Sequence, residues 1–136
     1  MNPLKSILSI AASGMRAQGE RLKVISENVA NSNSLGTTPG EDPYRRKTVS
    51  FAEMIDRESG ASMVEVKGIT RDKAEFTKVY DPSHPAADNT GYVKGTNVNS
   101  LIEMSNMREA SRSYEANLNM FEAGRRMRNQ IIDLLK

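Results

Sequence analysis

The sequence contains no cysteine and no tryptophan, and its single histidine is His84. The absence of cysteine excludes disulfides and thiolate metal sites, and one histidine excludes a cluster of histidine ligands. Only 5% of the 136 residues are aromatic and 38% are hydrophobic, which is little material for a self-sufficient core. We therefore expect helices that bury one apolar face against neighbours, with part of the chain ordering only on assembly.

Neither sign of charge dominates, because 19 basic residues face 17 acidic ones and the formal net charge is +2. This balance gives no general attraction to nucleic acid, so no nucleic-acid partner is predicted. No apolar run approaches the roughly 20 residues that a membrane-spanning helix needs. The apolar stretch after Lys5 keeps its helical spacing as far as Val29, so we interpret it as part of a mature helix rather than a cleaved signal peptide.

The sequence patterns of catalytic and cofactor sites are also missing. There is no phosphate-binding or dinucleotide-binding glycine loop and no nucleophile elbow. Asp81, His84 and Asp88 are close in the sequence, but Pro82 and Pro85 favour a surface loop held by turns over a cation site. The sequence predicts no enzyme activity, no catalytic residue, no cofactor and no metal.

Two basic clusters stand out, at Arg45-Arg46-Lys47 and at Arg125, Arg126 and Arg128. Acidic residues spread over both halves of the chain offset them, which disfavours a nucleic-acid surface. We interpret both clusters as solvated groups or as partners in ion pairs between subunits. Arginine near the end of a helix is also favoured by the helix dipole.

Apolar residues near the N-terminus recur at alternating steps of four and three, which predicts a helix with a heptad seam over residues 3–31. Asn2 is the predicted cap, with Pro3 at the first helical position, where its missing N–H costs nothing. Gln18 is the one polar residue in the seam, whose positions are Leu4, Leu8, Ala11, Met15, Gln18, Leu22, Ile25 and Val29.

The stretch ENVANSNSLG at residues 27–36 places three asparagines at the end of this helix. Amide side chains compete with the backbone for hydrogen bonds, so Asn31 or Asn33 is predicted to end the helix. One amide is enough for that purpose. A buried amide needs a hydrogen-bond partner, and a polar residue in a helical seam can fix the register of packing. We therefore interpret Asn28, Asn31 and Asn33 also as subunit contacts.

A second long helix is predicted from Ser100 to about Lys136, with Ser100 and Glu103 as a capping box. Its apolar face consists of Met104, Met107, Tyr114, Leu118, Phe121, Met127, Ile131, Ile132, Leu134 and Leu135. The simplest packing of two such helices is an antiparallel coiled coil, whose remaining apolar surface other subunits cover.

Both predicted helices contain glycine, at Gly14 and Gly19 in the first and Gly124 in the second. Each glycine costs about 1 kcal/mol relative to alanine in an isolated helix. Because Ala11, Ala12, Ser13 and Ala17 surround the first glycine, we expect the backbone of another helix to approach closely there.

The middle of the chain holds candidate strands around Val49 and Phe51, at residues 62–72 and at residues 74–81, while residues 81–97 have turn chemistry throughout. The predicted organisation is therefore an N-terminal helix of the coiled-coil core over residues 1–35, a middle region of short strands and loops over 36–98, and a C-terminal helix over 99–136. The fold class is mainly α with a small β-containing middle, and the long terminal helices pair as an antiparallel coiled coil.

Residues 11–36, AASGMRAQGERLKVISENVANSNSLG, resemble the N-terminal signature of flagellar axial proteins. That signature is a Ser-Gly pair, a heptad helix and an Asn-x-Ala-Asn motif, here Ser13-Gly14 and Asn28 to Asn31, with Ser34 where threonine is usual. Three further segments are similar to proximal rod proteins of the C type. They are PYRRKTVSF at 43–51, YDPSHPAADNTGYVKGTNVN at 80–99, which departs from the usual pattern at Gly95-Thr96, and MREASRSYEANLNMFEAGRRM at 107–127.

The resemblance implies a structural subunit of the proximal rod of the bacterial flagellar basal body. Such a rod is a helical hetero-polymer, the torque-transmitting drive shaft around the export channel. The implied partners are further copies of the chain, the B-, F- and G-type rod proteins and the adaptor between the rod base and the export gate or MS ring. The resemblance also implies a periplasmic position, outside the lipid, and export by the flagellar type III system without a cleaved signal peptide.

The subunit interface is predicted along the two helical seams, at Leu8, Met15, Leu22, Ile25, Asn28, Val29, Asn31, Met107, Tyr114, Leu118, Phe121 and Ile131. Two alternatives remain open at this point. One is another short axial protein, such as the B-type proximal rod protein, which the segment from His84 to Asn99 disfavours. The other is a helical accessory module of a type III secretion system, which has no need of a strand-containing middle.

Overall fold

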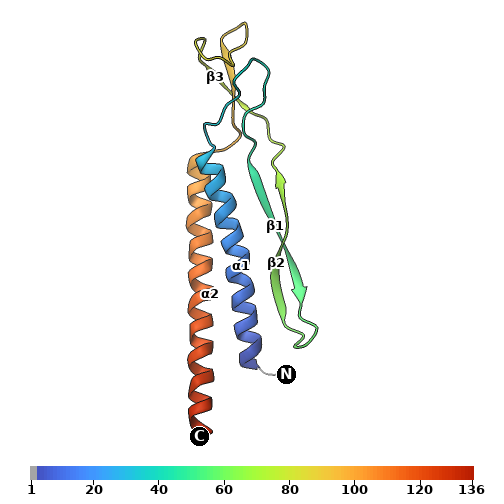
Figure 1. Ribbon diagram of the computed structural model, residues 1–136, viewed down its shortest axis with the longest axis vertical. Coiled ribbons are helices and arrows are strands. Elements are labelled where there is room, and N and C mark those ends of the chain that lie inside the picture. Colours follow the sequence, from blue (N-terminus) through green and yellow to red (C-terminus); the bar gives the residue numbers. More distant parts are fainter. Residues whose placement is uncertain (1–2) are drawn as a thin grey trace. The chain divides into compact units, whose positions relative to one another are not determined.

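The computed structural model describes residues 3–136, so the predicted cap Asn2 lies outside the described residues. A long helix lies near each end of the chain, and two small antiparallel sheets lie between them in the sequence (Figure 1). The elements are α1 (Pro3–Ala30), β1 (Lys47–Ile55), β2 (Ser62–Arg71), β3 (Thr77–Tyr80), β4 (Tyr92–Gly95) and α2 (Ser100–Leu134). Among the described residues, no helix combines the length and apolarity needed to cross a membrane.

The chain folds into two compact units. The first unit consists of residues 3–23, 49–68 and 108–136, and the second of residues 24–48 and 69–107. Both helices and the β1–β2 hairpin therefore contribute residues to each unit. The first unit holds most of α1, the outer part of the hairpin and most of α2, whereas the second unit holds the β3–β4 sheet.

In the first unit α1 contacts α2 at two glycines. A Cβ at Gly14 would lie 2.6 Å from Oδ1 of Asn117, and a Cβ at Gly124 would lie 3.1 Å from Cδ2 of Leu8. A larger side chain at either position would require the neighbouring side chain to shift. The predicted approach of another backbone to Gly14 is wrong, because the close neighbour is the side chain of Asn117. Gly19 has no described neighbour within 4 Å.

The outer part of the β1–β2 hairpin closes through a tight turn in the first unit. The N–H of Asp56 donates to the carbonyl of Ala61 at 2.9 Å, and Gly60 supplies the positive φ of +71° that the turn requires. Ser59 Oγ donates to the Asp56 carboxylate at 2.7 Å, and this hydrogen bond lowers the pKa of Asp56. The turn thus stabilises itself with its own side chains.

In the second unit β3 pairs with β4, with Thr77 opposite Gly95 and Tyr80 opposite Tyr92. The two tyrosine rings meet edge to face with their centroids 5.2 Å apart, and Val93 of β4 is only 2% exposed. Strand β4 contradicts the prediction that residues 81–97 form turns throughout. The strand has four residues and depends on pairing with β3, which local composition does not reveal.

The other strands differ from the predicted segments only at their ends. β1 begins at Lys47, two residues before the predicted Val49, and runs to Ile55. β2 ends one residue before the predicted limit of 72, and β3 occupies the second half of the predicted segment 74–81.

The start of α2 corrects the predicted capping box. The side chain of Asn99, rather than Ser100, accepts hydrogen bonds from the N–H groups of Leu101 at 3.0 Å and Ile102 at 3.3 Å. The carboxylate of Glu103 turns away from the helix terminus and pairs with an arginine of the second unit. The cap therefore lies one residue earlier, because Glu103 has a stronger partner elsewhere.

The end of α1 confirms one of the two predicted terminators. The helix ends at Ala30, and the side chain of Asn31 donates to the carbonyl of Glu27 at 2.9 Å. Ser34 Oγ then donates to Asn31 Oδ1 at 3.0 Å. The carbonyl of Glu27 thus accepts both the side chain and the backbone N–H of Asn31, the latter at 3.1 Å, whereas Asn33 is exposed.

Candidate assembly surface

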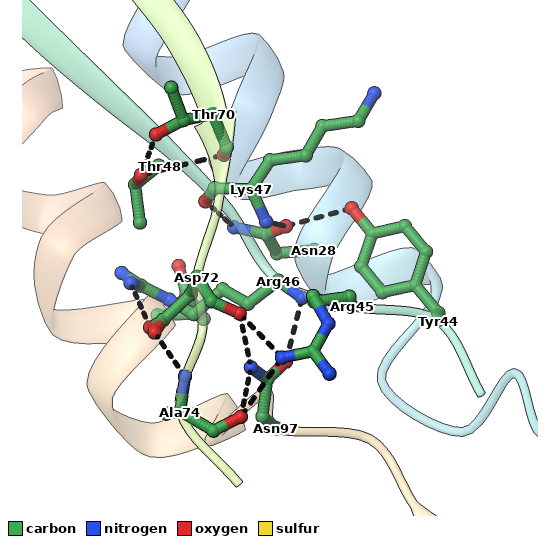
Figure 2. Close-up of polar contacts among 11 residues, drawn as sticks. Asn28, Tyr44, Arg45, Arg46, Lys47, Thr48, Thr70, Asp72, Ala74 and Asn97 are labelled. Carbon is green, nitrogen blue, oxygen red and sulfur yellow. Dashed lines mark hydrogen bonds and ion pairs between the residues drawn. The ribbon is translucent and has the colours of Figure 1, made fainter. Parts of the chain in front are cut away.

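The side chain of Asn28 lies at the centre of a polar cluster in the second unit (Figure 2). Its Nδ2 donates to the carbonyl of Lys47 at 2.9 Å, and its Oδ1 accepts from the N–H of Lys47 at 2.9 Å and from the hydroxyl of Tyr44 at 2.8 Å. Burial raises the pKa of the Tyr44 phenol. Asn28 is 1% exposed, so its amide acts inside the chain rather than on an exposed seam.

Arg46 lies between two carboxylates in the same cluster. Its Nε donates to Oε1 of Glu103, and its Nη1 donates to Oδ2 of Asp72 at 3.3 Å. Burial lowers the pKa of Arg46, but hydrogen bonds and charge from Glu103 and Asp72 outweigh that effect and raise it overall. The Glu103 side chain is 0% exposed, and its Oε2 has no hydrogen-bond partner among the described residues. The first turn of α2 is thereby fixed to the segment that precedes β1.

The structure corrects the interpretation of Arg45–Lys47 as a solvated or intersubunit cluster. Arg45 donates to the carbonyls of Asp72 at 2.9 Å and Ala74 at 3.1 Å, and its guanidinium lies 4.2 Å from the centre of the Phe76 ring. Lys47 Nζ pairs with Glu27 at 2.8 Å. These partners lie 20 or more residues away in the sequence, which is why the local pattern did not reveal them.

The residues considered for a cation site take part in local turns. His84 Nδ1 accepts the N–H of Ala86 at 3.0 Å. Asp88 Oδ1 accepts both the N–H and the hydroxyl of Thr90, at 2.9 and 2.7 Å, and the N–H of Tyr92 at 3.0 Å. The hydrogen bond from the Thr90 hydroxyl is the first cause of a lowered pKa of Asp88. Within residues 3–136 no three acidic or histidine side chains gather to hold a metal ion.

The last turns of α2 present an uncovered apolar face in the first unit. Every residue after Gly124 is exposed, and the exposed fractions are 42% for Met127, 46% for Ile131 and 83% for Leu134. These three residues follow one another at steps of four and three, which is the spacing of a helical seam. Large apolar side chains gathered on one face in this way are typical of a site that another protein covers.

The register of the helix contacts explains why this face is uncovered. Leu8 of α1 lies against Gly124, Gly14 against Asn117, and Arg21 Nη1 lies 3.4 Å from Glu109 Oε1. Residue numbers therefore rise along α1 as they fall along α2, and Pro3 falls opposite about residue 129, so Ile131 and Leu134 lie past the start of α1 whereas Met127 does not. Figure 1 shows the end of α2 continuing past the start of α1.

The predicted interface residues fall into three classes of exposure. Ile25 and Asn28 are buried within the chain, at 4% and 1% exposed, whereas Ile131 is exposed. The other nine are half-buried, namely Leu8, Met15, Leu22, Val29, Asn31, Met107, Tyr114, Leu118 and Phe121. Sequence reasoning did not identify Met120, which is 51% exposed and lies seven residues before Met127. It also did not identify the cluster around Arg46 and Glu103.

Comparison with known proteins finds flagellar rod proteins that are similar to this chain over most or all of its length. Residues 8–36 match the family described as Flagella basal body rod protein, and residues 89–134 match Flagellar basal body rod FlgEFG protein C-terminal. The flagellar basal-body rod protein FlgC of Agrobacterium fabrum is 52% identical over 136 residues, which cover 100% of this chain and 98% of the relative. The FlgC of Salmonella typhimurium is 40% identical over 126 residues, covering 91% and 92% of the two chains. The FlgC of Borreliella burgdorferi is 35% identical over 150 residues, covering 98% of each.

The match with the relative from Agrobacterium fabrum covers the whole of this chain, and the match with the relative from Borreliella burgdorferi covers 98% of it. The chain belongs to the FlgC family of flagellar basal-body rod proteins, a family of structural rod subunits rather than enzymes.

Proposed function

We propose that this rod subunit polymerises through its terminal helices into the proximal rod, the drive shaft that transmits torque around the export channel. The observation that carries the proposal is the uncovered apolar face of α2 at Met127, Ile131 and Leu134. Fully burying such a side chain contributes roughly 1.5–3 kcal/mol, so each subunit offers several kcal/mol to a neighbour. Contacts between different faces of identical subunits generate a helical filament when the rotation between neighbours does not close a ring.

The two helices of one subunit are proposed to form an antiparallel coiled coil. The contacts of Leu8 with Gly124, of Gly14 with Asn117 and of Arg21 with Glu109 support opposite helix directions. The alternating steps of four and three along α1 support a coiled-coil seam. In this proposal residues 1–35 and 99–136 form the core of the rod, and residues 36–98 form the region outside it.

The half-buried residues of the two seams are proposed to serve both the subunit and its neighbours. Their apolar surface is partly covered within the chain, and the remainder stays available to a second helix. Ile25 and Asn28 are proposed to act indirectly, by holding the end of α1 in place, because they are buried already. Asn31 is half-buried and has donor and acceptor capacity left, so it remains a proposed contact.

As a member of a basal-body rod family, the chain assembles with other rod proteins. We propose that its neighbours are the B-, F- and G-type rod proteins and the adaptor at the rod base. We also propose that it reaches the periplasm through the flagellar type III system without a cleaved signal peptide. The resemblance of the sequence to the C type supports these finer points.

A charge on the uncovered face tests the proposal. In a strain that lacks its own copy, the Ile131→Asp variant is expected to accumulate as a folded protein and to fail to restore rods and swimming. Asn129→Asp is the matched control, because Asn129 is exposed on the same turn of α2 and is already polar. Swimming that is normal with Ile131→Asp contradicts the proposal, and loss of swimming with both variants removes the case for the apolar face.

A further inference from the structure

Ser13 joins α1 to the β1–β2 hairpin in the first unit. Its Oγ accepts the N–H of Val64 at 3.2 Å and donates to the carbonyl of Ile10 at 2.8 Å. Two hollows meet at this contact, since both are lined by Ser13 and Val64, and their volumes are about 580 and 390 Å³. We call the two hollows together the hairpin groove.

Within one subunit, the wall of the hairpin groove has partly exposed apolar side chains and a polar atom without a hydrogen-bond partner among the described residues. Ile10 and Phe51 line the larger hollow and are 37% and 38% exposed. Gln18 lines it as well, and its buried Oε1 has no hydrogen-bond partner among the described residues. The exposed apolar surface of Ile10 and Phe51 favours an incoming group that is apolar.

The charges of the hairpin groove are complementary to those of the α2 end. Glu53 lines the larger hollow, and Glu20 and Glu65 line the smaller one together with the single cation Arg16. The end of α2 carries the opposite sign, because residues 125–136 hold Arg125, Arg126, Arg128 and Lys136 against one acid, Asp133. Opposite charges on two surfaces steer them together and fix their orientation.

The dimensions of the two surfaces also agree. From Ile10 to Glu20 the groove follows α1 for about 15 Å, and from Met127 to Leu134 the apolar face of α2 extends about 10 Å. The α2 end of the same chain is not available for this groove, because the helix register places Met127 opposite about residue 5 and the following residues still further from residues 10–20. A second copy is therefore the nearest source of such a helix.

We propose that the α2 end of one subunit, Met127 to Leu134, docks into the hairpin groove of another copy of this chain. The inference rests on the proposed rod function and specifies one surface of the assembly. The contact joins two different faces, so each subunit gives its α2 end to one neighbour and receives the α2 end of another. Such a contact extends into a filament when the rotation between neighbours does not close a ring. The guanidinium groups of α2 then lie near Glu53 and Glu65.

Paired single cysteines test the proposal, because the natural chain has none. Phe51→Cys marks the groove and Ile131→Cys marks the α2 end. Both variants, each shown to restore swimming by itself, are co-expressed in a strain without the native copy, and isolated basal bodies are treated with a short bismaleimide. The proposal predicts a cross-linked dimer that contains one chain of each variant. Ser83→Cys paired with Ile131→Cys is the matched control, because Ser83 is exposed outside the groove.

The outcomes separate this proposal from the function on which it rests. Mixed dimers with Phe51→Cys and few with Ser83→Cys support the groove. Cross-links confined to two Ile131→Cys chains show tail-to-tail pairing and overturn the groove while leaving the rod function intact. Equal yields with Phe51→Cys and Ser83→Cys overturn it as well. Basal bodies that contain neither variant, in cells that swim, contradict the rod function itself.

Charge reversal provides a second, independent measurement. Glu53→Lys is expected to lower the yield of mixed dimers about two- to fivefold, the range that an exposed ion pair supports. Adding Arg128→Glu on the cysteine-marked α2 end is expected to restore the yield, because the pair of charges is then inverted rather than lost. A yield that stays unchanged in both cases argues against the proposed orientation of the helix.

Discussion

The side-chain amide of Asn28 pairs with the main chain of Lys47 as a neighbouring strand would. Nδ2 of Asn28 donates to the carbonyl of Lys47 and Oδ1 accepts its N–H, both at 2.9 Å. Opposed residues of an antiparallel strand pair exchange the same two hydrogen bonds. The last turn of α1 therefore determines where β1 begins, two residues ahead of the apolar pattern at Val49.

Replacing Asn28 by alanine is expected to lower the free energy of unfolding by about 2–3 kcal/mol. The substitution removes three hydrogen bonds at once and leaves the N–H and carbonyl of Lys47 without this partner. Urea denaturation at neutral pH measures the change, with Asn33→Ala as the control because Asn33 is exposed. Equal stability of the Asn28→Ala and Asn33→Ala variants rules out the proposed role of the amide.

The double replacement of Asn28 and Asn31 by alanine is expected to leave export intact and to impair rod assembly.

Removing Arg46 is expected to be more damaging than removing both members of its buried ion pair. Arg46→Met leaves the fully buried Glu103 carboxylate without its cation, which costs about 3–5 kcal/mol. The double variant Arg46→Met/Glu103→Leu is expected to recover much of that loss, since no buried charge is left behind. Lys94→Met breaks the exposed pair with Asp42 and is expected to change stability by less than about 1 kcal/mol. Additive losses in the double variant contradict the coupling.

Acid is expected to destabilise the second unit partly through Asp72. The N–H of Ala74 is the first cause of its lowered pKa, followed by burial, which opposes the shift, and by the charge of Arg46. Because the folded pKa lies below the unfolded value, the carboxylate stabilises the fold above its ordinary pKa of about 3.9 and loses this effect as the pH falls through the folded pKa. Unfolding free energies measured between neutrality and about pH 3 should decline less steeply for Asp72→Asn. An identical acid slope in the two proteins disproves the linkage.

The free chain is expected to be less helical than the assembled subunit. The 28 residues of α1 and the 35 residues of α2 are helical in the structure, but every residue after Gly124 is exposed. Isolated helical ends of this length are marginal in water. Circular dichroism should therefore show a deficit for the free chain and a gain on assembly. A free chain with full helicity and a sharp cooperative melt contradicts ordering on assembly.

The helices were predictable because their signal is periodic and long. The seam from Leu4 to Val29 and the face from Met104 to Leu135 specify α1 and α2 without knowledge of any contact. The β3–β4 sheet was only half predictable. β4 is a four-residue strand between turn-forming residues, and it exists because Tyr80 and Val79 of β3 align with Tyr92 and Val93.

The parts of the candidate site also differ in how far the sequence reveals them. The apolar face at Met127, Ile131 and Leu134 follows from their spacing, so the sequence predicts it, but that this end of α2 is left uncovered follows from the helix register. The Arg46–Glu103 pair joins residues 57 positions apart, and local reasoning assigned Glu103 to a helix cap instead. The hairpin groove depends on one hydrogen bond between Ser13 and Val64, and no pattern in either segment indicates it.

The central claim is that a neighbouring subunit covers the end of α2, and thiol accessibility measures it directly. The Ile131→Cys variant carries the only thiol of its chain, so maleimide labelling reports on that position alone. The free chain should label rapidly, because Ile131 is 46% exposed, and the same variant in isolated basal bodies should be protected until denaturant dissociates them. Equal labelling of the free chain and the intact basal body would contradict the account.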